Sequence, residues 1–376
     1  MSSDITRRRL LGTVGAAGAG GVVVGASGGV IGARVTQDDP PTTLTTVGST
    51  TVPFHGKHQA GITTPLQARG HLAAFDLAPG ANRKTAAALL RRWSTAAQKL
   101  TAGEPVGDDT GVALDAGPSS LTVTFGFGSS FFDRTGLARQ RPEALEPLPD
   151  FTSDALDPKR SNGDLWVQIG ADDALVAFHA LRAVQKAAGD AARVRWQMNG
   201  FNRTPGATKQ PMTARNLMGQ MDGTNNPQPT DEDFDQRIFV PADGDPAWMA
   251  HGSYAVVRRI RMLLDSWERL SLDEQEKVIG RRKSDGAPLS GGTETTPVDL
   301  DKTDAAGNAL IAADAHVRTS APETNGGAAM LRRPFSFHDG IDEDGIPDAG
   351  LLFIGHVGGH LGQQFLGDEG GEFGGR

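Results

Sequence analysis

The stretch "DLWVQIGADDALVAFHALRAVQKAAGDAARVRW", residues 164–196, places two apolar segments of strand length around a helical segment. Residues 164–169 and 192–196 are the predicted strands. The segment between them, 172–189, begins with aspartates and ends with a glycine, as the N-cap and C-cap of a helix do. We therefore predict a strand–helix–strand unit here, which is half of a split βαβ fold.

The residues before this unit predict its other half. "HLAAFDL" (71–77) is an apolar run of strand length, and "LTVTFGF" (121–127) alternates so that every second side chain lies on one face. Between these two strands, apolar residues recur at steps of three and four, which predicts a helix with one apolar stripe: Ala86, Leu89, Leu90, Trp93, Ala96, Ala97 and Leu100. The order β-α-β-β-α-β predicts an α+β, ferredoxin-like domain, with an antiparallel sheet and two helices on one face.

The second half of the chain begins in the same way. A strand is predicted at 253–262, a helix at 271–280 or running from Asp265, and two more strands at 328–337 and 349–355. Ser271 and Glu274 have capping-box spacing, and Gly280 closes that helix. The expected last helix and strand are missing from the pattern.

From Gly355 onward the sequence has nine glycines in 22 residues and no helical stripe. Glycine opposes regular structure through its backbone entropy. We therefore expect the second domain to lack its last two elements, and to end in an atypical glycine-rich tail at 355–376. A frameshift, a truncation and real divergence are all compatible with this pattern.

The composition limits the function classes. The chain has 376 residues, enough for two domains, which we predict at 41–212 and 213–376. Its 37 Lys and Arg residues are scattered among 45 Asp and Glu residues, with a net charge of −8, which argues against nucleic-acid binding. There is no cysteine, so disulfides, thiolate metal sites and cysteine nucleophiles are excluded.

The first 40 residues have the features of a signal peptide with a leader. "TRRRLLG" (6–12) pairs arginines with leucines, and a weakly apolar Gly/Ala/Val segment of about one helical span follows. This pattern predicts export by the twin-arginine route to an extracellular, periplasmic or cell-surface location, and so predicts the translocation machinery as a partner. That route exports folded proteins, which suits a chain that binds a cofactor first. A single transmembrane anchor is the alternative interpretation.

Most histidines do not form a plausible metal site. His55 and His58 are three residues apart in a glycine-containing loop, without a helix to align them, so a zinc site is much less plausible than a surface or pocket loop. The segment 339–350 resembles a calcium loop but lacks ligands at both ends. His179 lies on the predicted helix 172–189 and is interpreted as a packed histidine.

Three motifs in order, GQMDG at 219–223, AHVR at 315–318 and MLRRPFSF at 330–337, resemble the dye-decolorizing peroxidase family of haem proteins. The chain is most similar to the twin-arginine-exported, deferrochelatase-like subgroup. Further similar stretches are 55–67, 125–137, 171–184, 251–262 and 348–353, so the resemblance extends from about residue 48 to 354.

The resemblance implies a haem b peroxidase, with one haem per chain, that reduces hydrogen peroxide and oxidises dyes, phenols or other aromatic reductants. It implies Asp222 and Arg332 as catalytic residues, with Arg333 as the one-residue alternative to Arg332. His316 would be the axial ligand of the haem iron. The residues expected around the cofactor are Arg318, Gly219, Met221, Gly223, Thr224, Arg333 and Phe335.

Physical chemistry is consistent with these roles. Reducing peroxide to water needs a base that takes a proton from one oxygen and returns it to the departing one, which a single carboxylate can do. A guanidinium stabilises the negative charge on the departing oxygen. A neutral imidazole is an ordinary ligand for haem iron, and family members hold theirs with an acidic partner that this sequence does not identify. The glycines beside Asp222 would let the backbone approach a flat porphyrin.

Two other interpretations remain. Relatives in ferrous-iron uptake systems suggest a haem-binding protein that releases iron from haem, with iron-uptake components as partners. An incomplete C-terminus could also leave an unstable chain that binds haem poorly, because it would expose apolar surface and an unpaired strand edge. A homo-oligomer is compatible with the sequence. Taken without the resemblance, Asp222 would be a turn residue, His316 an ordinary polar residue, and the two arginines solvated charges.

Overall fold

The computed structural model describes residues 46–107, 109–146, 148–149, 151–208 and 212–358. Contacts divide the chain into residues 1–43 and 44–376. The predicted signal segment and the glycine-rich residues after 358 lie outside the described ranges. Within those ranges, no helix combines the length and the apolar character needed to cross a membrane.

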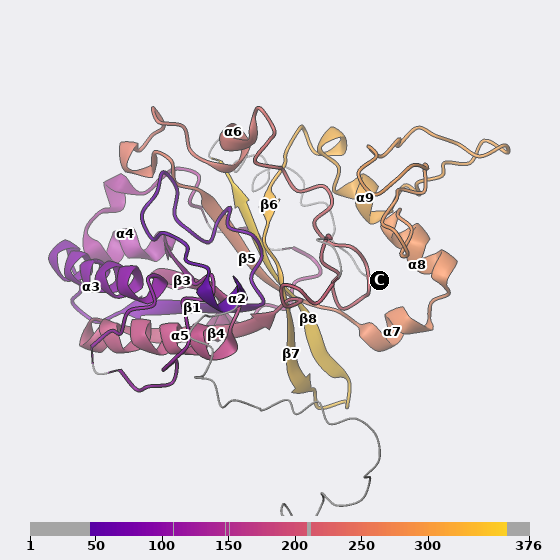
Figure 1. The fold of residues 1–376 in the computed structure, drawn as a ribbon. Coiled ribbons are helices and arrows are strands. Elements are labelled where there is room, and N and C mark those ends of the chain that lie inside the picture. Colours follow the sequence, from indigo (N-terminus) through magenta and orange to yellow (C-terminus); the bar gives the residue numbers. More distant parts are fainter. Residues whose placement is uncertain (1–45, 108, 147, 150, 209–211, 359–376) are drawn as a thin grey trace, which may run out of the picture. The chain divides into compact units, whose positions relative to one another are not determined.

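The N-terminal half has the predicted order of strands and helices (Figure 1). Its strands form an antiparallel sheet in the order β2-β3-β1-β4, which is the ferredoxin-like order and confirms the predicted fold class. The elements are β1 (Arg69–Leu77), α3 (Arg83–Thr101), β2 (Thr122–Phe127), β3 (Leu165–Ala171), α5 (Ala174–Ala188) and β4 (Ala192–Phe201).

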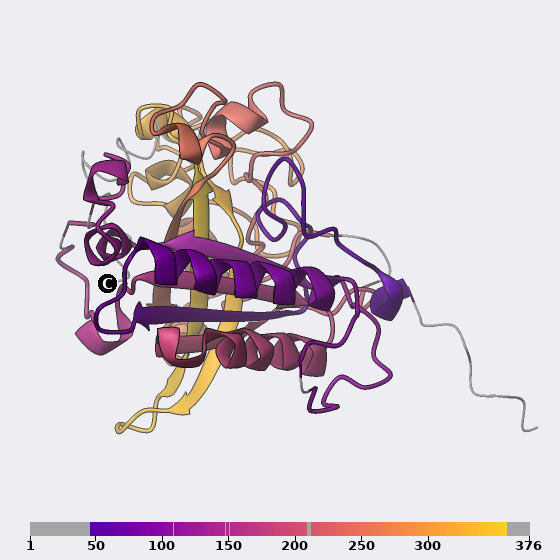
Figure 2. The same ribbon diagram turned by 90° about the vertical axis from the view of Figure 1, so that its left-hand side faces the viewer.

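Helices α3 and α5 cover one face of this sheet, as Figure 2 shows. The predicted apolar stripe of α3 is buried there, with Trp93 fully inside the core, where its indole N–H donates to the carbonyl of Val184 at 3.0 Å. Asn82 caps the start of α3 in a reciprocal capping box with Thr85. The second predicted helix is likewise confirmed, since Asp173 caps α5 and Gly189 follows its last turn.

The C-terminal half repeats part of this plan. Its strands follow the order β7-β8-β5, and no further strand pairs with β5 within the described residues. The elements are β5 (Tyr254–Arg261), α7 (Leu264–Arg269), α8 (Leu272–Ile279), β6 (Leu331–Arg332), β7 (Phe335–Ile341) and β8 (Pro347–Val357). The three strands predicted in this half are therefore present, and the predicted loss of a last helix and strand concerns residues outside the described ranges.

Two details differ from the sequence prediction. The segment 328–337 forms two strands, β6 and β7, because Pro334 lies between them and has no N–H for a ladder hydrogen bond. Strand β8 continues two residues beyond Gly355, where it pairs with β5 and β6. The capping box of Ser271 and the left-handed Gly280 are confirmed as the ends of α8, which is separate from α7.

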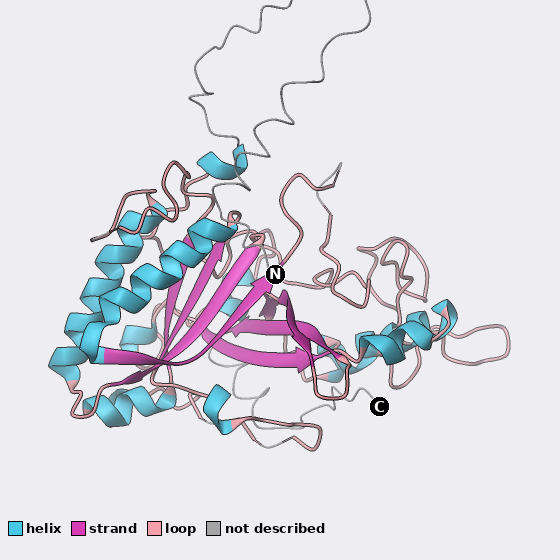
Figure 3. Ribbon diagram, turned by 90° about the horizontal axis from the view of Figure 1, so that it is seen from below, coloured by secondary structure: helices cyan, strands magenta, loops and turns pink. Residues whose placement is uncertain are grey.

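The two halves share one sheet (Figure 3). Phe201 of β4 pairs with Ser336 of β7, and the neighbouring Phe335 is fully buried against Gly70 and Gly200. Only a residue without a side chain leaves room for that ring, since a Cβ on Gly70 would lie 2.6 Å from its Cζ atom. The remaining helices and turns are α2 (Thr46–Ser49), α4 (Ser129–Thr135), α6 (Phe234–Ile238), α9 (His316–Thr319) and short 3-10 turns at Ala138–Gln140, Pro158–Arg160, Gly189–Ala191, Ala247–Met249 and Pro322–Thr324.

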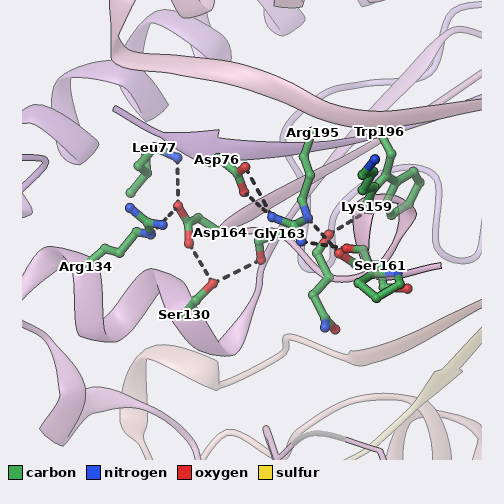
Figure 4. A network of polar contacts seen from close by, with 12 residues as sticks. Asp76, Leu77, Ser130, Arg134, Lys159, Ser161, Gly163, Asp164, Arg195 and Trp196 are labelled. Carbon is green, nitrogen blue, oxygen red and sulfur yellow. Dashed lines mark hydrogen bonds and ion pairs between the residues drawn. The ribbon is translucent and has the colours of Figure 1, made fainter. Parts of the chain in front are cut away.

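A polar network fixes the loop that enters β3 (Figure 4). The buried carboxylate of Asp164 accepts hydrogen bonds from the backbone N–H of Leu77 at 2.7 Å and the hydroxyl of Ser130 at 2.6 Å, and it pairs with Arg134 at 3.0 Å. Buried carboxylates are stable only with such partners. These contacts attach α4 to the end of β1 and the start of β3, two inner strands of the N-terminal sheet.

Candidate active site

Asp222 lies at the end of a tight hairpin. Its backbone N–H donates to the carbonyl of Ala214 at 2.8 Å, and an isolated β-bridge joins Arg215 to Met221. The turn includes Gly219, whose φ of +77° is in the region that favours glycine. Met221 packs against Gly286, where a Cβ would come within 2.5 Å of its sulfur. The glycine-rich motif therefore forms a close turn that orients one carboxylate.

Asp222 and Arg332 form a direct ion pair. The Nη1 atom of Arg332 lies 2.7 Å from Oδ1 of Asp222, although the two residues are 110 positions apart. The Asp222 side chain is 11% exposed and that of Arg332 is 25% exposed, so the pair is mostly shielded from water. The other carboxylate oxygen, Oδ2, accepts only a long hydrogen bond of 3.3 Å from the amide of Asn216 among the contacts of the described residues.

The two neighbouring arginines have different environments. Arg332 points to Asp222, whereas Arg333 is buried and donates to the carbonyls of Thr64 and Pro65 and to the side chain of Gln67. Burial lowers the pKa of Arg333 to about 10. Of the two arginines that the sequence left open, Arg332 is the one that the structure brings to the aspartate.

His316 begins the short helix α9. Burial lowers the pKa of this imidazole, the charge of Arg332 lowers it further, Asp222 raises it, and Arg281 lowers it. These charges act on the ring because Asp222, Arg332 and Arg281 lie in its neighbourhood. Asp222 and Arg332 thus lie close enough to His316 for their charges to act on its ring, and burial favours the neutral imidazole, which is the form that ligates metals.

Arg318 supports the same helix. Its guanidinium donates to three backbone carbonyls of the segments before α9, those of Leu300, Ile311 and Ala312. These bonds connect Leu300, Ile311 and Ala312 to the helix that begins at His316. In this structure Arg318 therefore orders the loop that carries His316, and its expected contact with a cofactor stays a prediction.

The other predicted cofactor residues are distributed differently. Gly219, Met221, Gly223 and Thr224 all lie in or beside the Asp222 hairpin, and Gly223 has a φ of +125°. Phe335, by contrast, has no exposed surface and packs in the apolar cluster between the two halves of the sheet. Its position gives it a packing role.

Asn226, Glu294 and Arg281 lie near the ion pair but belong to no motif and were not predicted. Asn226 donates to the carbonyl of Arg332 at 2.8 Å and accepts from its N–H at 3.2 Å. Glu294 accepts hydrogen bonds from Thr213 and Thr224, and its backbone carbonyl accepts one from Arg281 at 2.9 Å. The only sequence signal for them was the polar, glycine-rich composition of their loops, which is too common to identify a site.

Two other histidines considered in the sequence, His58 and His179, contact neighbouring residues. His58 stacks on Phe239 with 3.4 Å between ring centroids, and its Nδ1 lies 2.9 Å from the carbonyl of His251. His179 is mostly buried, with its Nε2 atom 3.4 Å from Asp109. No group of three or more His, Asp or Glu side chains suited to a metal ion occurs in the part of the chain that the structure describes.

These residues fit a haem. A porphyrin supplies four nitrogen ligands itself, so the protein needs to add only one imidazole, which His316 can provide. The other requirement for peroxide reduction is an acid and a cation close together, and the Asp222–Arg332 pair meets it.

Comparisons with known proteins find relatives over most of the chain. The family model for the N-terminal part of Dyp-type peroxidases matches residues 59–202, and that for the C-terminal part matches 213–363. The chain is 46% identical to a dye-decolorizing peroxidase of Thermobifida fusca over 307 residues, covering 79% of this chain and 71% of the relative. It is 36% identical to the deferrochelatase of Escherichia coli over 368 residues, covering 94% of this chain and 85% of the relative.

Solved structures are also similar. A DyP-type peroxidase from Streptomyces coelicolor superposes with a TM-score of 0.83 at 70% identity, over 86% of this chain and 90% of the other. One from Cellulomonas bogoriensis superposes with a TM-score of 0.78 at 40% identity, over 82% and 85% of the two chains.

Proposed function

Because the chain belongs to the Dyp-type peroxidase family and is a haem-dependent peroxidase, we propose that Asp222 and Arg332 are its catalytic residues and that His316 is the axial ligand of the haem iron. The observation that supports this proposal is the ion pair of 2.7 Å between Asp222 and Arg332, close enough to His316 for both charges to act on its imidazole.

The reaction reduces hydrogen peroxide to two water molecules with two electrons and two protons. When bound, haem supplies the redox-active iron at which peroxide is reduced and to which the aromatic reductant returns electrons. His316 would hold that iron through a neutral imidazole nitrogen, while Arg318 orders the loop that presents it.

Asp222 moves the proton. We assign this step to Oδ2, because Oδ1 is occupied by Arg332, whereas the one contact of Oδ2 with the described residues is the long bond from Asn216. The carboxylate takes a proton from one oxygen of peroxide and delivers it to the departing oxygen, so that water leaves instead of hydroxide.

Arg332 stabilises charge. Negative charge grows on the departing oxygen, and a guanidinium fixed nearby lowers the free energy of that state. Its preorganisation comes from the pair with Asp222 and from the two hydrogen bonds of Asn226 to its backbone. A side chain held in advance needs little rearrangement during the reaction.

Purified variants test these roles. Asp222→Ala and Arg332→Ala should retain the haem absorption band and lose peroxide-dependent dye oxidation by roughly 100-fold or more. His316→Ala should lose the band. Arg282→Ala is a matched control, because that arginine lies on the surface in a pair with Asp285. Wild-type turnover in Asp222→Ala or Arg332→Ala would refute the assignment.

Release of iron from haem is the second candidate function. It is favoured by the 36% identity to a deferrochelatase over 94% of this chain. The same pocket suits both functions, so the products distinguish them. Formation of iron-free porphyrin from haem under anaerobic conditions would support iron release, with iron-uptake components as partners. Oxidised dye without free porphyrin would support peroxidase activity alone.

We also propose export by the twin-arginine route to an extracellular, periplasmic or cell-surface location. The arginines and the apolar segment within residues 1–40 support this, and so does the need to bind haem before export. Replacing Arg7 and Arg8 with lysine should abolish export of the folded protein.

The proposed domains, 41–212 and 213–376, are supported by the two family models, which match on either side of residues 203–212. A homo-oligomer remains a proposal for sedimentation analysis.

A further inference from the structure

Glu294 is hydrogen-bonded to both ends of the hairpin that bears Asp222. Its Oε1 atom accepts hydrogen bonds from the hydroxyls of both Thr213 and Thr224, the second at 3.0 Å. These threonines lie on either side of the hairpin 214–222. One carboxylate oxygen therefore joins the two ends of the hairpin.

The segment that contains Glu294 is itself firmly held. Arg281 is buried and donates from Nη1 to the carbonyls of Gly286 at 2.8 Å and Glu294 at 2.9 Å. Gly286 contacts both the Met221 side chain and the stem of Glu294, since a Cβ placed there would meet Met221 at 2.5 Å and Glu294 at 3.1 Å. The carboxylate thus has a fixed support from which to hold the hairpin.

The charge of Glu294 also balances a second arginine. Burial lowers the pKa of Arg281, Glu294 raises it, and Arg332 lowers it. The carboxylate of Glu294 therefore offsets part of the repulsion that Arg281 experiences from Arg332, which is itself paired with Asp222.

We propose that Glu294 is a positioning residue for Asp222, which closes the hairpin through Thr213 and Thr224 and sets the direction of the catalytic carboxylate. The inference rests on the proposed role of Asp222. Glu294 touches no reacting atom in this scheme, and it acts through the hairpin.

Three variants separate the hydrogen bonds from the charge. Glu294→Ala removes both, Glu294→Gln keeps an oxygen that can accept from both threonines, and the double variant Thr213→Val with Thr224→Val removes only the donors. Glu268→Ala is the control, because that glutamate is exposed on α7. If Glu294→Ala does not fold, the single variant Thr224→Val removes one bond with little change in shape.

Hydrogen exchange of the haem-free protein gives a readout independent of activity. The amides of Asn216 and Asp222, which bond across the hairpin, should exchange about tenfold faster in Glu294→Ala and in the double valine variant. They should exchange at the wild-type rate in Glu294→Gln and in the control. Unchanged exchange in Glu294→Ala would overturn the proposal.

Activity of the haem-loaded enzyme gives the second readout. A carboxylate misplaced by about 1 Å can cost roughly 100-fold in rate, so kcat/KM for peroxide should fall by about 10- to 100-fold in Glu294→Ala and the double variant with the haem band retained. Glu294→Gln should recover most of it. An equal loss of kcat/KM in Glu294→Gln and Glu294→Ala would overturn the positioning role. Wild-type activity of Asp222→Ala would refute the proposed function, whereas the exchange result would still report on the hairpin.

Discussion

Replacing Asn226 tests whether the backbone of Arg332 must be held for catalysis. The Asn226 side chain makes two hydrogen bonds to Arg332, one to its carbonyl at 2.8 Å and one from its N–H at 3.2 Å. Asn226→Ala removes both without touching the guanidinium or Asp222. The adjacent Asn225 is exposed, so Asn225→Ala is a control of the same size and almost the same place in the chain.

The expected magnitude follows from these two bonds. Each contributes about 0.5–1.5 kcal/mol net, so the free energy of unfolding should fall by about 1–3 kcal/mol in Asn226→Ala. If about 1.4 kcal/mol of that loss also appears in the transition state, kcat/KM for peroxide falls about tenfold. Asn225→Ala should change the free energy of unfolding by less than about 0.5 kcal/mol, as surface substitutions usually do.

The two assays are chemical denaturation of each variant and peroxide-dependent dye oxidation at saturating haem. The haem absorption band, measured on the same samples, separates loss of haem from loss of catalysis. If Asn226→Ala is as stable and as active as Asn225→Ala, the backbone contacts do not position Arg332, and the argument from preorganisation is wrong.

Three further predictions concern the fold that supports the site. Arg333→Ala should lower the free energy of unfolding by about 3 kcal/mol or more in chemical denaturation, because it leaves the three acceptors of the guanidinium unpaired, and Arg333→Lys should recover part of the loss. Gly70→Ala should destabilise by about 1–3 kcal/mol in the same assay through its clash with the outer ring atoms of Phe335, and adding Phe335→Leu, which lacks those atoms, should relieve part of this. Burial lowers the pKa of His71 below its ordinary value of 6.5 despite the bond to Asn199, so the folded protein binds that proton less readily than the unfolded chain. Stability should therefore decrease as the pH falls below about 6.5, and thermal melts of His71→Gln should show a smaller decrease.

The sequence predicted the parts of this fold that depend on local patterns. Alternation in 121–127 and the three-and-four spacing of 86–100 follow directly from strand and helix geometry, and both apolar faces pack in the core, with only Leu90, Phe125 and Phe127 partly buried. The break at Pro334 was missed because the run "MLRRPFSF" is otherwise typical of a strand. The extension of β8 past Gly355 was missed because cross-strand pairing outweighs the low strand propensity of one glycine.

The candidate site was predictable only where residues have a recognisable order. Asp222, His316 and Arg332 lie in three motifs whose sequence resembles a family. Asn226 and Glu294 have no such context, since their roles depend on hydrogen bonds to residues 106 and 70 or more positions away. No spacing rule relates positions so far apart in the chain, so only the folded structure brings them into view.

The neighbouring arginines show why the N-terminal half matters to a site built in the C-terminal half. Arg333 directly follows Arg332 at the end of β6, so the direction of Arg332 depends on how Arg333 is held. Arg333 is held by Thr64, Pro65 and Gln67, all of which precede the first strand of the N-terminal sheet. The buried guanidinium therefore transmits the position of that segment to the residue that faces Asp222. It follows that a separated C-terminal half would keep all three motif residues and still lack the contact that orients one of them.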